Sequence, residues 1–450
     1  MAQQNTTVGT KVSGGSLEAA EFNSVNSVLN ANATDAQSRT VTLETASADY
    51  SSRLTTIEAT SIPIQSYTTE NLPASATTGT IALDTTIGFL IYHKNGSWYK
   101  LFDNSLDVFV TGFVFTVNTA NAGTSNSDQF TIPTVSGNSY NYTVDWGDST
   151  TDSYTTDAAP TKTYAAGAGT YTITITGAFQ GVAFNGGGDK LKLTEISNMG
   201  AITFAADATG AFYGCENLQV PAGTTGPDTS ATTDFQWFWR DCELLIPPLM
   251  DTSSGVTFFG AFRDCFSMIA MPALDFTGVP NSGNSTAFRD TFRNCTSLLN
   301  FDAVTWGDVG TDMRTTFDNC SSLTAFPAIN TARVTGMRET FRGCSTATTF
   351  PAYTTSNVAS FQSAWSGCSA LTTFPVLDFS SATVFTDAWL NCALNSASVD
   401  NILAALVAGG AASLTTSLAG GTAIAESSWS TQAQADVATL RANGWTVSSN

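Results

Sequence analysis

The sequence predicts a mainly β, multidomain chain whose second half is a solenoid of stacked repeats. The 450-residue chain has eight cysteines, which recur in its second half at steps of 23 to 30 residues, each with an aromatic residue three positions earlier. A unit of this length buries its apolar face only by stacking on its neighbours. Segments of the first half alternate polar and apolar residues, as half-buried strands do. The cysteines are Cys215, Cys242, Cys265, Cys295, Cys320, Cys344, Cys368 and Cys392.

The regular thiols have two interpretations. They are either reactive groups, as disulfides, metal ligands or nucleophiles, or an inward-facing structural ladder. One small thiol per repeat packs like Ala or Val, and the sequence has no CxxC pair and no nearby histidine that would complete a zinc site. Parallel side chains in neighbouring coils also disfavour disulfide geometry. The structural ladder is therefore favoured, and no metal or other cofactor is expected.

The repeat unit is clearest at 317–327, 341–351 and 365–375, which share the pattern Phe/Trp-x-x-Cys-Ser followed by a Phe-Pro pair. Threonine-rich segments follow two of these units, at 331–337 and 355–358. The pattern resembles the BspA-type leucine-rich repeats of bacterial surface proteins and mobile-element proteins. That resemblance implies display and adhesion at a surface rather than catalysis.

Composition and charge narrow the class of protein. The chain has 17 Lys and Arg against 37 Asp and Glu, for a net charge of −20. Such a charge disfavours nucleic-acid binding, which needs a basic surface. No apolar segment is long enough to predict membrane insertion. The first residues, 1–9, lack the basic region and apolar core of a signal peptide. We therefore expect synthesis in a host cytoplasm, where thiols stay reduced.

The first predicted parts are a docking segment, 1–15, and a coiled-coil stalk, 16–62, which ends at Pro63. A single amphipathic helix packed on a domain is the alternative for the stalk. A helix this polar is poorly stable without identical partners, so a parallel homotrimer is favoured. The apolar seam, along which the helices of the coiled coil would pack, consists of residues that recur every seven positions. They are Phe22, Leu29, Ala36, Leu43, Tyr50 and Ile57.

A small β neck module is expected at 63–106. It contains a strand at 81–84 and a hairpin at 89–101, whose Asn-Gly pair suits a two-residue turn. His93 is the only histidine and is expected at the surface, which excludes His-dependent triads and clusters of His metal ligands. Two strings resemble parts of tailed-phage fibres and virion appendages. The neck string is 71–99, and the N-terminal string is 12–35.

The third part, 107–181, is expected to be an immunoglobulin-like β-sandwich. Its Trp-Gly-Asp turn at 146–148 and its Gly-Thr-Tyr strand at 169–171 resemble PKD-like domains. Asp145 and Asp148 could act as calcium ligands or as an acid pair. The favoured interpretation is that they cap the turn by accepting backbone hydrogen bonds. The predicted strands lie at 112–118, 129–133, 140–146 and 170–176.

The solenoid is expected over 182–395, with a first strand at 190–196, and the C-terminal cap over 396–450. In the cap we expect two helices, strands at 413–418 and 445–447, and a helix stop at 443–444. A cap is needed because an open last coil exposes sheet edges and apolar surface. The apolar face of the first helix consists of Val399, Ile402, Leu403 and Leu406, and that of the second includes Val437 and Leu440.

Most of the arginines of the chain precede the cysteines by two or six residues. On a helical turn these positions share one face, so the side chains are predicted to stack into a stripe. One interpretation is a site for the anionic groups of cell-surface glycans. The other is a structural ladder paired with the interleaved Asp241, Asp264, Asp290, Asp318 and Glu339, and both stay open. The stripe consists of Arg240, Arg263, Arg289, Arg293, Arg314, Arg338 and Arg342.

Together these features predict a phage structural protein, a fibre or appendage that attaches the virion to the host surface through its repeats. The expected partners are copies of itself, other virion proteins at the N-terminus, and a host glycan or protein. The alternatives are a bacterial cell-surface adhesin and a capsid-decorating fibre without a receptor role. An enzyme, such as a glycan depolymerase with paired carboxylates, is not expected.

Overall fold

The computed structural model divides into two compact units, Met1–Thr111 and Gly112–Asn450, which are described separately. In the first unit only the backbone of four strands is described. The predicted docking segment, the heptad seam and the side chain of His93 lie outside the described residues. The described part of the chain is mainly β with two α-helices, which confirms the predicted class. In the second unit the structure describes residues 112–200, 202–244, 246–279, 286–301, 303–307 and 309–450.

The first unit contains one four-stranded sheet in the order β1-β2-β3-β4. Strand β1 runs parallel to β2, and the other pairs are antiparallel. Lys94 pairs with Ser97, which confirms the hairpin expected from the sequence. The strands are β1 (Gln65–Tyr67), β2 (Ile81–Asp84), β3 (Phe89–Lys94) and β4 (Ser97–Lys100).

The second unit begins with a β-sandwich. One sheet has the order β11-β5-β10-β7-β8, and β6 pairs with β9 in the other. Trp146 is fully buried and donates from Nε1 to Asp152 at 2.9 Å. Asp145 and Asp148 accept backbone hydrogen bonds two residues ahead, which confirms that they cap the turn. The strands are β5 (Phe113–Asn118), β6 (Gln129–Thr131), β7 (Tyr140–Asp145), β8 (Thr151–Tyr154), β9 (Thr161–Thr163) and β10 (Thr170–Gln180).

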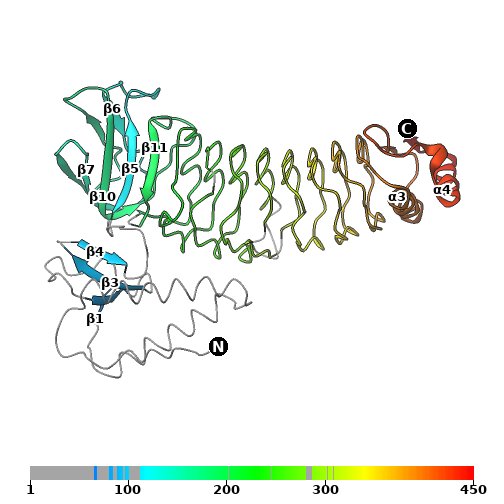
Figure 1. Cartoon of the computed structure of the whole chain (residues 1–450), viewed down its shortest axis with the longest axis horizontal. Helices are drawn as coiled ribbons and strands as arrows, with labels where there is room; N and C mark the ends of the chain where they lie inside the picture. The colour runs from blue at the N-terminus through cyan, green and yellow to red at the C-terminus, as the bar shows by residue number, and fades with distance from the viewer. Residues whose placement is uncertain are drawn as a thin grey trace, which may run out of the picture. The chain divides into compact units, whose positions relative to one another are not determined.

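Two strands join the sandwich to the solenoid. Strand β11 (Leu193–Asn198) pairs antiparallel with β5, and β12 (Ile202–Thr203) pairs parallel with β10. On its other side, β11 donates from the Ile196 N–H to the Gln219 carbonyl of the first coil. The predicted boundary between 181 and 182 therefore falls within one continuous hydrogen-bonded structure, from which the coils extend in a row (Figure 1).

Each coil is built from tight turns joined to its neighbours by a parallel ladder. We number a coil from its cysteine, so that the aromatic residue stands at position −3, and we count coils 1 to 8 along the chain. The N–H groups at −5, −3 and −1 donate to the next coil; the Phe292 N–H, for example, donates to the Thr316 carbonyl at 2.9 Å. Parallel bridges at position −8 connect Asp312, Gly336 and Ser360 in succession.

The backbone is left-handed at −5 and −1 in all eight coils, which excludes a helical turn there. The prediction that a helical turn precedes each cysteine is therefore wrong. Most of these positions hold Gly, Asn or Asp, which adopt positive φ at the lowest cost. The residues are Gly210, Gly214, Trp237, Asp241, Gly260, Asp264, Asp290, Asn294, Thr315, Asn319, Glu339, Gly343, Ser363, Gly367, Asp387 and Asn391.

The interior is dominated by the aromatic residues at −3, which stack in three runs, in coils 1 and 2, coils 3 to 6, and coils 7 and 8. Phe317 lies between Phe292 and Phe341, with ring centroids 5.8 and 5.6 Å away and planes within 8° of parallel. Trp365 and Trp389 stack in the same way at 5.3 Å. All of these rings are fully buried, so each coil supplies one layer of a continuous apolar core.

The C-terminal cap has the predicted order of elements. The residues expected on the apolar faces of helices α3 (Ser396–Gly409) and α4 (Thr431–Ala442) are buried. Strands β13 (Thr415–Ser417) and β14 (Thr446–Ser448) pair in parallel, and Phe385 of the last coil bridges to Thr416. The cap therefore covers the end of the solenoid with its own sheet and helices (Figure 1).

The cap contains an acid-sensitive ion pair. Glu426 accepts hydrogen bonds from Arg441 at 2.6 and 2.9 Å and another from Ser449, which together lower its pKa from 4.5 to about 2. A carboxylate with a lowered pKa stabilises the fold above its unfolded pKa, and this contribution is lost as the pH falls toward 2. We expect Glu426→Gln to remove this part of the acid sensitivity, measured as hydrogen-exchange protection of β13 and β14 from pH 5 to 2.

The control is Glu216→Gln, which removes a carboxylate that pairs with Lys190 and is more exposed than Glu426. It should leave the pH profile of the cap strands unchanged. An equal change of the profile in both variants would contradict the assignment to Glu426.

Candidate binding face of the solenoid

The seven arginines of the predicted stripe lie on the segment from position −8 to −1, which we call the turn face. Arg240, Arg263, Arg293 and Arg342 stand at −2, and Arg289, Arg314 and Arg338 stand at −6. Hydrogen bonds of the coil ladder connect consecutive residues of the second group: the Asp290 N–H donates to the Arg314 carbonyl, and the Thr315 N–H to the Arg338 carbonyl. Since adjacent strands lie about 4.8 Å apart, the structure brings these arginines into columns.

The arginines at −2 bridge consecutive coils. Arg293 lies 3.2 Å from Asp318 of the next coil, and Arg342 lies 2.7 Å from the same carboxylate in the preceding coil. Arg240 and Arg263 each reach an aspartate of the following coil at 3.9 Å. The side chain of Asp318 is fully buried; burial raises its pKa, and the two arginines oppose that rise. These arginines therefore serve to hold neighbouring coils together.

The arginines at −6 are arranged differently. In the ion pairs of the described residues, each contacts a carboxylate of its own coil and none bridges to a neighbour: Arg289 pairs with Asp290, Arg314 with Asp312, and Arg338 with Glu339. The arginines at −2 contact a carboxylate of their own coil as well as one of a neighbouring coil. Their side chains are 38%, 43% and 51% exposed, more than those of the group at −2.

The turn face is not a basic surface, because its eight coils carry nine carboxylates against seven arginines. The arginines pair with six of these carboxylates, Asp241, Asp264, Asp290, Asp312, Asp318 and Glu339. This pairing supports the structural interpretation for the group at −2. The arginines that remain able to contact a ligand are those of the exposed column at −6.

Behind the turn face, all eight cysteines are buried and unpaired. In coils 2 to 8 the thiol donates a hydrogen bond to the carbonyl of the −3 aromatic residue in the preceding coil, at 3.0 to 3.2 Å. In six of these seven pairs, all but the one at the Trp239 carbonyl, the same carbonyl also accepts the N–H of its own coil's cysteine. The thiol therefore does more than fill space, because it joins two coils through a lone pair that an Ala or Val would leave unbonded.

The buried thiols are expected to be unreactive in the folded protein. Burial raises the pKa of Cys392 to about 12 and the pKa of each of the other seven further above the usual value. Because the thiolate is the nucleophile, no thiol should react with Ellman's reagent at pH 8 in the native chain, and eight should react in guanidinium chloride. Rapid labelling of the native protein would contradict this arrangement.

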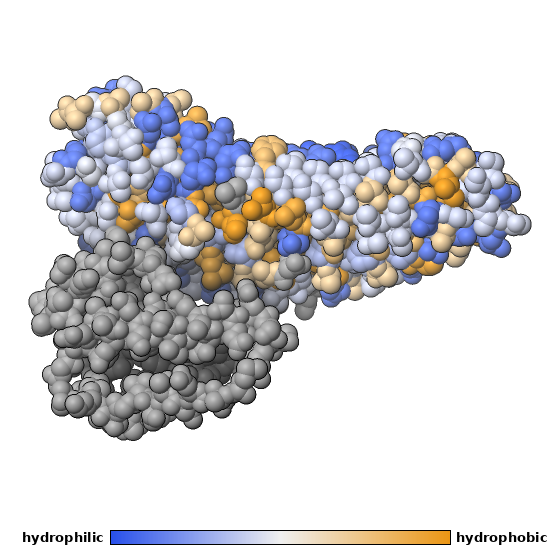
Figure 2. All heavy atoms as spheres, viewed as in Figure 1, coloured by the Kyte–Doolittle hydropathy of each residue, from blue (hydrophilic) through white to orange (hydrophobic). Residues whose placement is uncertain are grey.

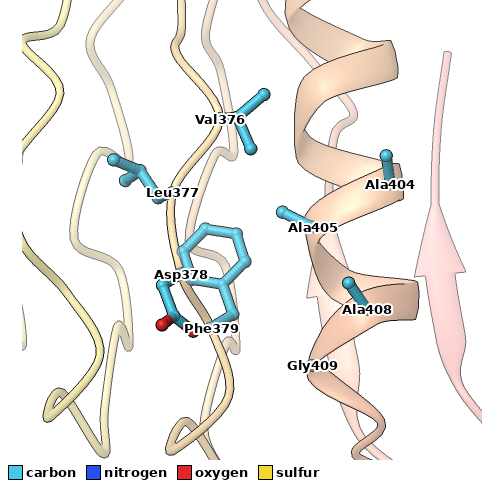
Figure 3. A pocket seen from close by; sticks show the side chains of 8 residues that line it. All are labelled: Val376, Leu377, Asp378, Phe379, Ala404, Ala405, Ala408 and Gly409. Atoms are coloured by element: carbon cyan, nitrogen blue, oxygen red, sulfur yellow. The ribbon is translucent and has the colours of Figure 1, made fainter.

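A shallow groove lies between the last coil and helix α3 (Figure 3). It measures about 350 Å³ and is lined by apolar side chains such as Val376, Leu377 and Phe379, facing the small residues Ala404 and Ala405. Asp378 is the only charged residue of the lining, and its carboxylate already accepts the Ser380 N–H. The groove therefore brings together no set of polar groups that would orient a ligand.

Two features of the second unit were not predicted from the sequence. Lys192 and Asp189 form a fully buried pair between the sandwich and the first coil, and the early coils expose a group of aliphatic side chains. Within the described residues, no three His, Cys, Asp or Glu side chains are placed to hold a metal ion. In the same part of the chain, no helix is long and apolar enough to cross a membrane.

The chain was compared with protein-family models, with curated proteins and with solved structures, and none of these comparisons gave a match.

Proposed function

We propose that the chain is an attachment protein carried on a virus particle, and that it contacts anionic groups of the host surface through Arg289, Arg314 and Arg338. The observation that carries the proposal is the exposed column at position −6. Its three guanidinium groups occur in consecutive coils, and their backbones are fixed by the ladder. A rigid row of this kind suits a repetitive ligand such as a surface polysaccharide.

The hydrogen bonds of these arginines leave donors for a ligand. Arg314 uses Nε and Nη2 for Asp312, and Arg338 uses Nε for Glu339. The Nε of Arg289 is buried and lies 3.8 Å from Asp290, so this side chain offers a ligand only its Nη groups. Since a guanidinium has five N–H donors, each side chain retains groups that can bind a carboxylate or phosphate. The neighbouring carboxylates hold the guanidinium groups in place, which lowers the entropic cost of binding.

The test is the triple variant Arg289→Gln, Arg314→Gln and Arg338→Gln in the full chain. Each charge-assisted hydrogen bond contributes about 1.5 kcal/mol or more, so binding to host cells or to their purified anionic polysaccharide should fall at least about tenfold. The matched control is Lys190→Gln, which removes a cation outside the column and should bind like the unaltered chain. Unchanged binding by the triple variant, with its circular dichroism intact, would disprove the site.

The place on the particle is tested separately by electron microscopy with a label on the C-terminus. A distal label supports a receptor-binding fibre, whereas a label flush with the shell supports capsid decoration. Display on a bacterial surface would use the same column, and cell fractionation distinguishes it. Loss of capsular polysaccharide during incubation with the protein would instead favour an enzyme.

A further inference from the structure

Coils 2 to 4 expose a group of large apolar side chains. Figure 2 shows apolar surface over the early part of the solenoid on the face toward the viewer. Monomeric proteins rarely leave such side chains clustered, whereas single exposed ones are common. We call this group the aliphatic patch, because four of its five members are aliphatic and only one is aromatic. It consists of Ile246 (41% exposed), Leu249 (58%), Phe266 (46%), Ile269 (40%) and Leu299 (46%).

Three members of the aliphatic patch form a column at position +4. Ile246, Ile269 and Leu299 occupy this position in coils 2, 3 and 4, and the Leu299 N–H donates to the Ile269 carbonyl at 3.1 Å. The side chains of neighbouring coils at one position lie about one strand spacing apart. The column therefore presents a continuous apolar strip along the solenoid.

The fold itself does not require apolar residues at +4. Coils 5, 6 and 7 have Thr324, Thr348 and Thr372 at this position, and all three are exposed. The hydroxyl of Thr324 donates to the Leu299 carbonyl, and that of Thr372 donates to the Thr348 carbonyl. Threonine thus satisfies the coil ladder at +4, and the apolar residues of coils 2 to 4 need another explanation.

We propose that the aliphatic patch packs against the same patch of a second copy of this chain. Each copy carries a net charge of −20, so two copies approach closely only where the facing surfaces lack charge. The net charge therefore opposes association of freely diffusing copies, and the contact forms only between copies that are already held together by another part of the chain.

The position of the patch favours a second copy. It lies on the coils that follow the sandwich most closely, and 111 residues precede the second unit, including the heptad seam predicted from the sequence. If the N-terminal residues join the copies, the second units of these copies meet at a millimolar effective concentration, which is high enough for a small apolar contact to form. Contact is then expected on the early coils, while the threonine-bearing coils 5 to 7 remain apart.

The first test is photo-crosslinking of the full chain. A photoreactive amino acid replaces Leu249 in the patch or, as the matched control, Val376, which is 62% exposed on a later coil. We expect cross-linking between copies from position 249, mapped by mass spectrometry to the early coils of the partner copy, and much less from 376. A cross-link only to residues 1–111 of the same chain, or none above the control, would overturn the proposal.

The second test uses Ile246→Thr, Ile269→Thr and Leu299→Thr together, which copy the residue type of the later coils. Burying one aliphatic side chain in an interface strengthens the association about tenfold or more. We therefore expect the three substitutions together to weaken the association of the copies about a thousandfold, measured by cross-linking in a concentration series. Circular dichroism and the unfolding midpoint should remain those of the unaltered chain. Unchanged cross-linking in this folded variant would show that the column does not join the copies.

Discussion

Lys192→Met is expected to lower the free energy of unfolding of the sandwich by about 3–5 kcal/mol, because it breaks a buried ion pair by removing one partner. The ammonium group lies within hydrogen-bonding distance of the carbonyl oxygens of Ser125, Asn126 and Gln129, at 2.7 to 3.1 Å, and of the Ser125 hydroxyl. Asp189 lies 3.8 Å away, and both side chains are fully buried. Methionine fills most of the volume but removes one donor from each of these oxygens, of which the Asn126 carbonyl still accepts the Gln129 N–H.

The carboxylate of Asp189 completes this cluster. It accepts hydrogen bonds from the N–H groups of Ser125 and Thr131 and from the Ser125 hydroxyl. Gly123 is required beside it, since a Cβ there would lie 2.5 Å from Asp189 Oδ1 and 2.7 Å from Lys192 Cε. The cluster thus attaches the loop between β5 and β6 to the segment that leads into the solenoid, and it explains why the two parts form one compact unit.

The matched control is Lys190→Met, two residues earlier. Lys190 is partly exposed and pairs with Glu216 at 2.9 Å, a surface ion pair that contributes at most about 1 kcal/mol. Both variants are compared by the midpoint of the urea transition followed by circular dichroism. The double variant Lys192→Met, Asp189→Asn should recover part of the loss, because it no longer buries an unpaired charge. Equal midpoints for the two lysine variants would refute the structural role of Lys192.

This lysine also shows where sequence reasoning reached its limit. Lys190 and Lys192 stand two residues apart in a predicted strand, 190–196, and nothing in that pattern distinguishes them. Strand β11 begins only at Leu193, and Lys192 lies in the turn before it, where its N–H donates to the Asp189 carbonyl and its side chain is fully buried. The acceptors that surround it are backbone carbonyls of a loop more than sixty positions earlier, and a local pattern contains no information about such contacts.

The solenoid was predictable to the extent that its period recurs. Cysteines and aromatic residues at fixed spacing predicted the coils, because residues at the same position of stacked coils are buried against one another. The apolar faces of α3 and α4 predicted the cap. The arginine columns were expected from helical geometry, yet they arise from turns with left-handed residues such as Asp290 and Asn294. The arginines divide into a bridging group and an exposed group according to whether their carboxylate partner lies in a neighbouring coil or in their own. The identity of this partner depends on the folded structure and is not visible in the spacing of the sequence.

Phe317→Ala is expected to lower the free energy of unfolding of the central coils by about 3–5 kcal/mol, the usual cost of truncating a buried phenylalanine. The ring is fully buried and stacked on both faces by Phe292 and Phe341, with Phe301 against its edge. In a solenoid each coil contacts only its neighbours, so a cavity in the middle weakens two interfaces at once.

The measurement is the urea midpoint together with hydrogen exchange of the ladder amides on either side, those of Asn294 and Asn319. Phe317→Leu is the matched control, since it keeps most of the volume and should cost under about 1.5 kcal/mol. Protection should fall more in the alanine variant, and it should fall in coils 4 to 6 before the cap. If neither variant lowers the urea midpoint or the protection of these amides, the stacked rings do not hold the coils together. The stability of the solenoid would then lie in the backbone ladder and the thiol hydrogen bonds, which both variants retain.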